Sequence, residues 1–321
     1  MTDTNQRNLP DYHLATTGAF NLPVTIRLLQ RRPTNRVDHW EDDGRYLRAF
    51  QTRDGLRLVV VTNRGTTEEP DVRLEIRGGT VTDDVARDLM KTTRWMLGLD
   101  AVPAPTAWLA VMEPRFGAVT RALSGFRVPC FPTLFETCAR LIPFQQLSLD
   151  AGTAIAGRLV DRLGEALTLE GKEWITFPSP ATIIDASVES LREIGLSRAK
   201  AVALQALAGR AFAGELDAVR FHSLPSHAAL EALQALPGIG PWTAGVILLR
   251  GLRRMDVFPT GDVGAARNLP LLLGLSDSWS PSDAVTFAER FGDHRGYLYF
   301  LGLGFNLLSR GLIAGSADED R

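Results

Sequence analysis

The first hundred residues contain short apolar segments separated by turn signals. Residues 71–77 (DVRLEIR) alternate polar and apolar side chains, as a half-buried β-strand does. Residues 46–50 and 56–61 flank the dipeptide Asp54-Gly55, which is typical of β-hairpin turns. The pattern therefore predicts strands in the first part of the chain, two of them joined as a hairpin.

From Thr82 the apolar positions recur at helical spacing as far as Gly98, and Thr82 or Asp83 can cap that helix. Beyond a proline-containing stretch at about 101–132, the chain forms a succession of segments bounded by Gly, Pro, Ser or Asp. Helices are predicted at residues 133–141, 149–167, 186–194, 198–213, 226–235, 241–252, 263–273, 282–291 and 295–309. This order predicts a mainly α protein with an α+β N-terminal domain.

Length and composition indicate a globular chain. At ~100–200 residues per domain, 321 residues suggest two domains, or three small ones. With 45% hydrophobic residues the chain can bury a core, which excludes wholesale disorder. The longest apolar stretch, residues 298–308, is interrupted by glycines and Asn306 and is too short to span a bilayer. The first twenty residues lack a basic-then-apolar start, so we expect no signal peptide.

Charge and cysteine content further narrow the classes of protein to which the chain can belong. A net charge of −2 and a pI of about 6.2 argue mildly against a protein that coats nucleic acid. A compact DNA site remains compatible, because it needs only a few phosphate contacts. The two cysteines, Cys130 and Cys138, cannot form a disulfide framework or the four thiolates of a zinc or iron–sulfur site. A reducing cytoplasm is the default expectation.

The segment LPGIGPWTA at residues 236–244 carries the clearest motif. Gly238 and Gly240 permit a tight turn after the predicted helix at 226–235, and Pro241 suits the first position of the next helix. This is a helix–hairpin–helix, whose backbone N–H groups can bind a phosphate without any lysine. A plain αα-turn packed in a core is the other interpretation, and the turn taken alone favours it.

Asp262 follows Trp242 by twenty positions, in the segment VFPTGDV at residues 257–263. Taken alone, such an aspartate is more simply interpreted as a helix N-cap. The two roles are compatible, because a capping carboxylate is held rigidly and rigidity suits an electrostatic catalyst. Asp262 is therefore a candidate for both.

The hairpin LPGIG followed by this aspartate resembles the helix–hairpin–helix superfamily of DNA base-excision glycosylases. The wider chain is similar to its alkylation-repair branch, the bacterial 3-methyladenine DNA glycosylase II (AlkA-like) family. The similarity is carried by residues 125–129 (GFRVP), Phe135-Glu136, residues 141–148 with Gln145-Gln146, and residues 177–180, 191–201 and 256–259. It covers most of the chain, most strongly from about residue 125. It implies two helical subdomains around a cleft and an α/β N-terminal domain.

The resemblance implies a monofunctional enzyme, which removes a flipped base and leaves an abasic site. Relatives that also cut the strand need a lysine where this chain has Trp242. Asp262 is the implied catalytic residue, which stabilises an oxocarbenium-like sugar and orients or activates water. Trp242, Val246 and Gln145 are implied at the base pocket. Trp242 offers a π face to a cationic base, and core packing is an equally weighted alternative for it. Val246 gives the base pocket a thinner wall than an aromatic residue would.

The implied DNA contacts lie on the hairpin and on a neighbouring loop. They are Gly238, Ile239, Gly240, Thr243, Gln146 and Arg250. Gln146 stands on the loop expected to enter the duplex, where relatives often carry an apolar wedge. Arg250, Arg253 and Arg254 form either a solvated face or a phosphate contact, and Arg267 can belong to the same surface.

The expected function is a monofunctional DNA glycosylase that excises alkylated bases, such as 3-methyladenine, in base excision repair. No side-chain metal site or cofactor is expected, although the superfamily's hairpin tends to hold a monovalent cation on its backbone, here residues 236–240. The expected partner is damaged double-stranded DNA, bound by a monomer in the cytoplasm at the nucleoid, with no membrane. Two alternatives stay open: a glycosylase for deaminated or oxidised bases, which needs a general acid, and a non-catalytic DNA-binding protein. Asp262 argues against the second, because a carboxylate repels phosphate.

The expected domain organisation follows from the same motifs. Residues 1–113 form a mixed α/β N-terminal domain, with a boundary near residues 113–116. Residues 114–321 form an all-helical glycosylase domain with the helix–hairpin–helix at 226–253.

Overall fold

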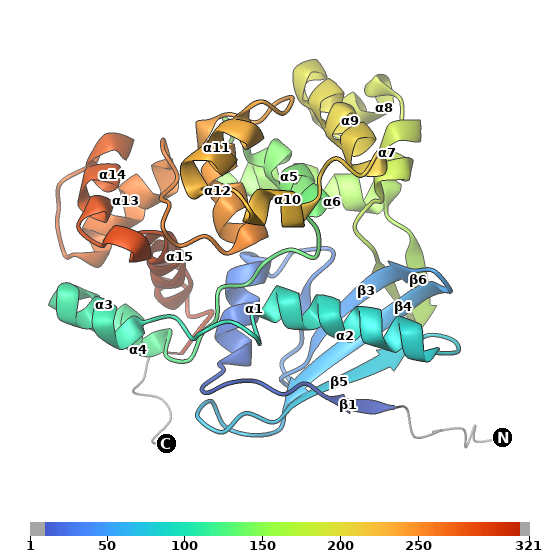
Figure 1. Ribbon diagram of the computed structural model, residues 1–321, viewed down its shortest axis with the longest axis horizontal. Helices are drawn as coiled ribbons and strands as arrows, with labels where there is room; N and C mark the ends of the chain where they lie inside the picture. The colour runs from blue at the N-terminus through green and yellow to red at the C-terminus, as the bar shows by residue number, and fades with distance from the viewer. Residues whose placement is uncertain (1–9, 315–321) are drawn as a thin grey trace.

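The computed structural model describes residues 10–314, in which a five-stranded antiparallel sheet is joined to a larger helical part (Figure 1). The strand order is β1-β5-β4-β3-β2. The strands are β1 (Asp11–His13), β2 (His39–Trp40), β3 (Tyr46–Thr52), β4 (Gly55–Asn63) and β5 (Val72–Arg77). Between residues 10 and 314, the structure contains no helix of the length and apolar character that a bilayer crossing needs.

The strands and the helix predicted in the first hundred residues are confirmed. β3 and β4 pair antiparallel up to Thr52 and Gly55, and Gly55 has a φ of +100°, which glycine adopts at little cost. Helix α2 (Asp83–Leu97) begins where Thr82 accepts a hydrogen bond from the Val85 N–H, and it ends at Gly98 with a φ of 67°. The residues that the pattern identified as turn and caps therefore do hold these positions.

The rest of the chain is mostly helical, and the nine helices predicted between residues 133 and 309 are all present, all but one with both ends within two residues of the prediction. Their bounds are α5 (Leu134–Leu141), α6 (Leu149–Leu163), α8 (Val188–Glu193), α9 (Arg198–Phe212), α11 (Ser226–Gln234), α12 (Pro241–Leu252), α13 (Val263–Leu272), α14 (Pro281–Glu289) and α15 (Tyr297–Ser309). The pattern missed α1 (Leu22–Gln30), α3 (Thr106–Met112), α4 (Gly117–Ala122), α7 (Pro180–Asp185) and α10 (Ala218–His222). Short 3-10 helices are η1 (Pro114–Phe116), η2 (Ile142–Phe144) and η3 (Gly292–His294).

The helix expected at residues 149–167 is wrong in its second part, and so is the expectation that residues 114–321 are all helical. α6 ends at Leu163, and the chain then forms a β-hairpin of β6 (Ala166–Leu169) and β7 (Lys172–Ile175). The turn residues Glu170 and Gly171 both have positive φ, 53° and 74°. Two positive φ angles are typical of a type I′ turn, which glutamate rarely enters, so the sequence signal was weak.

The sheet is covered on both faces. One face packs against α1 and α2, through apolar residues that include Ile26 and Leu89. The hairpin β6–β7 packs on the other face, where Trp174 joins Leu47 and Leu58. α1 also contributes Val24 to the core of the helical part. α1 therefore contributes apolar side chains to both cores, that of the sheet and that of the helical part.

A buried ionic cluster also joins the sheet to α5. Arg48 of β3 donates to Asp38 at 2.8 Å and to both carboxylate oxygens of Glu136, at 2.8 and 2.6 Å. Arg140, one turn after Glu136, donates to it at 2.6 Å. Glu136 and its neighbour Phe135, which carry part of the family resemblance, are both buried, so Glu136 serves this cluster rather than the surface of α5.

Candidate active site

The helix–hairpin–helix predicted from LPGIG is present, with α11 and α12 joined through residues 235–240. Gly238 has a φ of +72°, and a Cβ built on it would lie 2.5 Å from the Cβ of Ala203 in α9. A side chain here would therefore be strained and would collide with α9, so the turn requires glycine. The Leu236 carbonyl accepts a hydrogen bond from the Ile239 N–H at 3.2 Å, which closes the turn.

The N-terminus of α12 has no capping side chain among residues 10–314. Pro241 is its first residue and has no N–H, and the N-cap residue Gly240 brings no side chain. Gly240 is exposed, and a Cβ there would meet nothing within 4 Å. The start of α12 at Gly240 and Pro241 thus lies at an open surface, at the positive end of the helix dipole, which is a geometry suited to binding phosphate.

Asp262 and Trp242 are in direct contact. The indole N–H of Trp242 donates to Oδ2 of Asp262 at 2.8 Å, and Oδ1 accepts from the Ala265 N–H at 2.7 Å. The N-cap role of Asp262, at the start of α13, is therefore confirmed. Asp262 is 7% exposed and Trp242 is partly exposed. Both carboxylate oxygens have fixed partners, so the charge is held in one orientation.

Gln145, which follows η2, links a third segment to the hairpin. Its Nε2 donates to the Gly238 carbonyl at 2.7 Å and to Oγ1 of Thr243 at 3.1 Å. The side-chain amide is therefore occupied by the hairpin. The next residue, Gln146, is exposed and has a φ of +55°, and the following Leu147 is 43% exposed.

These segments lie within a region of the chain that matches a known protein family. A family model described as "HhH-GPD superfamily base excision DNA repair protein" matches residues 139–290, which contain the Gln145 loop, the hairpin and Asp262. The chain belongs to the HhH-GPD superfamily.

Named relatives of this HhH-GPD protein are DNA repair enzymes. It is 34% identical over 241 residues to the "Probable bifunctional transcriptional activator/DNA repair enzyme AlkA" of Mycobacterium tuberculosis, a match covering 71% of this chain and 45% of that protein. It is 30% identical to DNA-3-methyladenine glycosylase 2 of Escherichia coli, over 58% of this chain and 63% of that protein. The chain thus matches about half the length of the mycobacterial relative.

A solved structure confirms the predicted fold class. The 3-methyladenine DNA glycosylase from Archaeoglobus fulgidus superposes with a TM-score of 0.75 and 25% identity, covering 93% of this chain and 99% of that chain. The mainly α architecture with an α+β N-terminal part is therefore that of an HhH-GPD glycosylase.

Arg250 was expected to contact DNA, and this is wrong. It is 0% exposed in the second half of α12, where it donates to the carbonyls of Leu28 and Leu29 at 3.0 and 3.1 Å. Burial lowers the pKa of Arg250 to about 10. The guanidinium binds the C-terminal end of α1 rather than solvent or phosphate, because α12 is surrounded by other elements there.

Other expected site residues are also buried. Val246 lies in the helical core with no exposed surface, which contradicts its expected place in the base pocket. Ile239 and Thr243, which were expected to contact DNA, are also buried residues. Val246 and Thr243 are buried because α12 packs against α5 and α11, whereas Gly240 and Pro241 at its start remain exposed.

The two arginines after α12 bind backbone carbonyls rather than presenting a free face. Arg253 donates to the carbonyls of Val128 and Trp95, and Arg254 donates to the carbonyls of His222 and Leu224. These contacts tie the end of α12 to the loop before α5, to α2 and to the α10–α11 connection. Arg267, by contrast, is exposed on α13.

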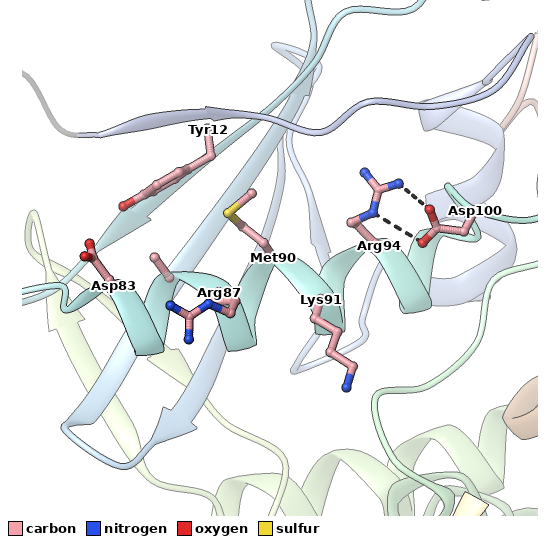
Figure 2. A pocket seen from close by; sticks show the side chains of 8 residues that line it. Tyr12, Asp83, Arg87, Met90, Lys91, Arg94 and Asp100 are labelled. Atoms are coloured by element: carbon pink, nitrogen blue, oxygen red, sulfur yellow. Dashed lines mark hydrogen bonds and ion pairs between the residues drawn. The ribbon is translucent and has the colours of Figure 1, made fainter. Parts of the chain in front are cut away.

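A pocket of about 480 Å³ lies elsewhere, between β1 and α2 (Figure 2). Tyr12 of β1 and Met90 of α2 line it, and an ion pair of Arg94 and Asp100 closes one end. It shares no residue with the hairpin, the Gln145 loop or Asp262. The pocket is therefore separate from the candidate active site.

Metal ligands are not gathered at this site. In the part of the chain that the structure describes, no three His, Cys, Asp or Glu residues are placed to hold a metal ion. Cys130 and Cys138 are buried free thiols, and burial raises the pKa of Cys138 to about 12. In the backbone stretch 236–240, the Gly238 carbonyl accepts the Gln145 amide. A carbonyl keeps a second lone pair, so a monovalent cation at this backbone stays a prediction.

Proposed function

We propose that this chain is a monofunctional DNA glycosylase that removes alkylated purines from duplex DNA. The observation that carries the proposal is the Asp262 carboxylate, fixed by Trp242 and by the start of α13, and joined through Trp242 to the uncapped first turn of α12. A site that binds a phosphate and holds a rigid negative charge nearby suits cleavage of a bond whose transition state carries positive charge on the sugar.

The reaction follows from these parts. The target nucleotide leaves the stack, because its glycosidic bond cannot be reached inside the duplex. The C1′–N bond breaks, and its electron pair leaves with the base, so that a cationic alkylpurine departs as a neutral molecule. The sugar becomes oxocarbenium-like, and the Asp262 carboxylate stabilises it electrostatically. Water then adds to C1′ and loses a proton, which leaves an abasic site.

Trp242 serves two purposes in this proposal. Its indole N–H orients the Asp262 carboxylate, and the same hydrogen bond fixes the plane of its ring. A cationic base over such a ring gains ~0.5–2 kcal/mol, whereas a neutral base gains less. This difference favours alkylated purines over their unmodified counterparts.

A second, strand-cutting activity would need a lysine to form a Schiff base with the sugar. The three lysines of the chain have other places: Lys91 is on α2, Lys172 pairs with Glu41 at 2.5 Å, and Lys200 donates to the Gln145 carbonyl at 2.7 Å. We therefore expect no cleavage of the strand at the abasic site.

The first test is a base-release assay on randomly methylated duplex DNA. We expect methylpurines in the supernatant, identified by mass, and strand breaks only after alkali. Breaks without alkali would contradict the monofunctional assignment. Binding to abasic duplex without any base release would favour a non-catalytic DNA-binding protein. Release of only deaminated or oxidised bases, from a second panel of substrates, would favour a glycosylase for those bases.

A hairpin substitution tests the phosphate contact. Gly240→Leu should weaken binding to every duplex by about tenfold to a hundredfold, because the side chain displaces a phosphate from backbone N–H donors worth about 1.5–3 kcal/mol each. The fold should tolerate it, since Gly240 has a φ of −91° and open space around it.

Gly209→Leu on α9 is the matched control for this variant, because Gly209 is also exposed with nothing within 4 Å of an added Cβ. Fluorescence anisotropy with abasic duplexes of two unrelated sequences gives both affinities. Unchanged binding by Gly240→Leu would show that the hairpin does not touch DNA. A loss confined to one sequence would show that it reads bases rather than backbone.

A further inference from the structure

Lys200 makes contacts that the proposed reaction does not use. It lies in the first turn of α9, after the N-cap Ser197. Its Nζ donates to the Gln145 carbonyl at 2.7 Å and to the Pro143 carbonyl at 3.4 Å. The side chain is partly buried, and burial lowers the pKa of Lys200. Its ammonium thus meets the carbonyl end of η2, where a positive charge is favourable.

Gln145 is held from both sides by these contacts. Its carbonyl accepts from Lys200, while its side-chain amide donates to the Gly238 carbonyl and to Thr243. α9 also touches the hairpin itself, where Gly238 packs against Ala203. Lys200 and Ala203 are three positions apart on one face of α9, so a single helix supports both the loop and the hairpin turn.

The residue after Gln145 shows why the loop needs this support. Gln146 has a φ of +55°, a left-handed conformation that is costly for a residue with a side chain. Such a conformation persists only where its surroundings determine it. The carbonyl that Lys200 binds belongs to the peptide bond leading into Gln146, so this contact fixes the direction in which the Gln146 side chain leaves the loop.

We propose that Lys200 is a positioning residue, which holds the loop of residues 145–148 against the hairpin so that Gln146 meets the duplex at a fixed distance from the phosphate-binding turn. The proposal rests on the proposed glycosylase function, because it assigns the loop to base extrusion. It predicts that Lys200 matters for taking the base out of the stack and not for breaking the glycosidic bond.

The test compares two substrates that differ in the cost of extrusion. One is a duplex with a single methylated purine in a normal pair, and the other has the same purine opposite an abasic position, where unstacking is easier. For Lys200→Met, we expect single-turnover base release to fall about tenfold on the paired duplex, which corresponds to one lost charge-assisted hydrogen bond. We expect less than about threefold loss on the abasic-opposed duplex.

Two kinds of control accompany this variant. Lys200→Arg keeps donors for both carbonyls and should restore most of the activity on the paired duplex. Lys91→Met makes the same chemical change on α2, at a residue outside the proposed site, and should leave both rates unchanged. Thermal unfolding checks that each variant is folded, and Lys200→Gln, a polar substitution at the same partly buried position, replaces Lys200→Met if the latter does not fold.

The outcomes separate this proposal from the function on which it rests. Equal losses on both substrates would mean that Lys200 supports the structure in general, and no loss on either would mean that the loop does not depend on it. Either result overturns the positioning role. If the unaltered protein releases no base from either duplex, the glycosylase proposal itself fails, whatever the variants do.

Discussion

Asp262→Asn should lower base release by on the order of 10²–10³-fold or more, while binding to abasic duplex stays within about twofold of the unaltered protein. The substitution removes the negative charge that stabilises the oxocarbenium-like sugar. It keeps the shape of the residue, and an asparagine oxygen can still accept the hydrogen bond from the Ala265 N–H at the start of α13. The asparagine NH₂ cannot accept the indole N–H of Trp242, so the orientation of that contact is lost as well.

Asp217→Asn is the matched control, because Asp217 is also a helix N-cap, which accepts from the Val219 N–H at 2.9 Å in α10. It makes the same chemical change at a residue with no contact to Trp242, and we expect unchanged base release. Single-turnover release from methylated duplex and anisotropy with abasic duplex measure the two properties separately. Loss of release and binding together, with a lowered melting temperature, would mean that Asp262 is structural only.

The sequence predicted those parts of the fold whose causes are local. Thr82 and Gly98 bound α2 because a capping hydroxyl and a left-handed glycine act on their immediate neighbours. α1 escaped prediction because its Val24, Thr25 and Ile26 are β-branched, which lowers helix propensity. Its burial between the sheet and the helical part, which no local pattern reveals, stabilises it as a helix.

In the candidate site, too, local features were visible in the sequence and contacts between distant residues were not. The N-cap role of Asp262 was visible in the sequence and is confirmed, and the family resemblance made the same residue the catalytic candidate. Arg250 was misplaced because its partners, the carbonyls that end α1, lie more than two hundred positions away. A clue was present, since Arg250 is the one charge in the otherwise uncharged α12. Lys200 was not connected to the site, although lysine is rare in this chain, because its contact to Gln145 spans 55 positions.

The largest effect on stability is expected at the buried ionic cluster between the sheet and α5. Asp38, Arg48 and Glu136 are almost fully buried, and Arg140 completes two positive and two negative charges. Burial alone would raise the pKa of Asp38, but Arg48 and Arg140 outweigh it and lower the pKa to about 2. The Asp38 carboxylate is therefore charged at neutral pH, and the arginines beside it compensate its charge within the core.

Glu136→Ala should lower the free energy of unfolding by about 3–5 kcal/mol, because it leaves Arg48 and Arg140 buried with one carboxylate between them. This is a large part of the ~5–15 kcal/mol that stabilises a typical domain. Asp84→Ala is the control: its exposed carboxylate also pairs with an arginine, Arg87 at 2.8 Å, yet removing it should change the free energy of unfolding by less than about 1 kcal/mol. Urea unfolding followed by circular dichroism gives both values. Similar small changes in the two variants would show that the cluster relaxes into solvent when Glu136 is absent, and that apolar contacts such as those of α1 hold the sheet to the helices without it.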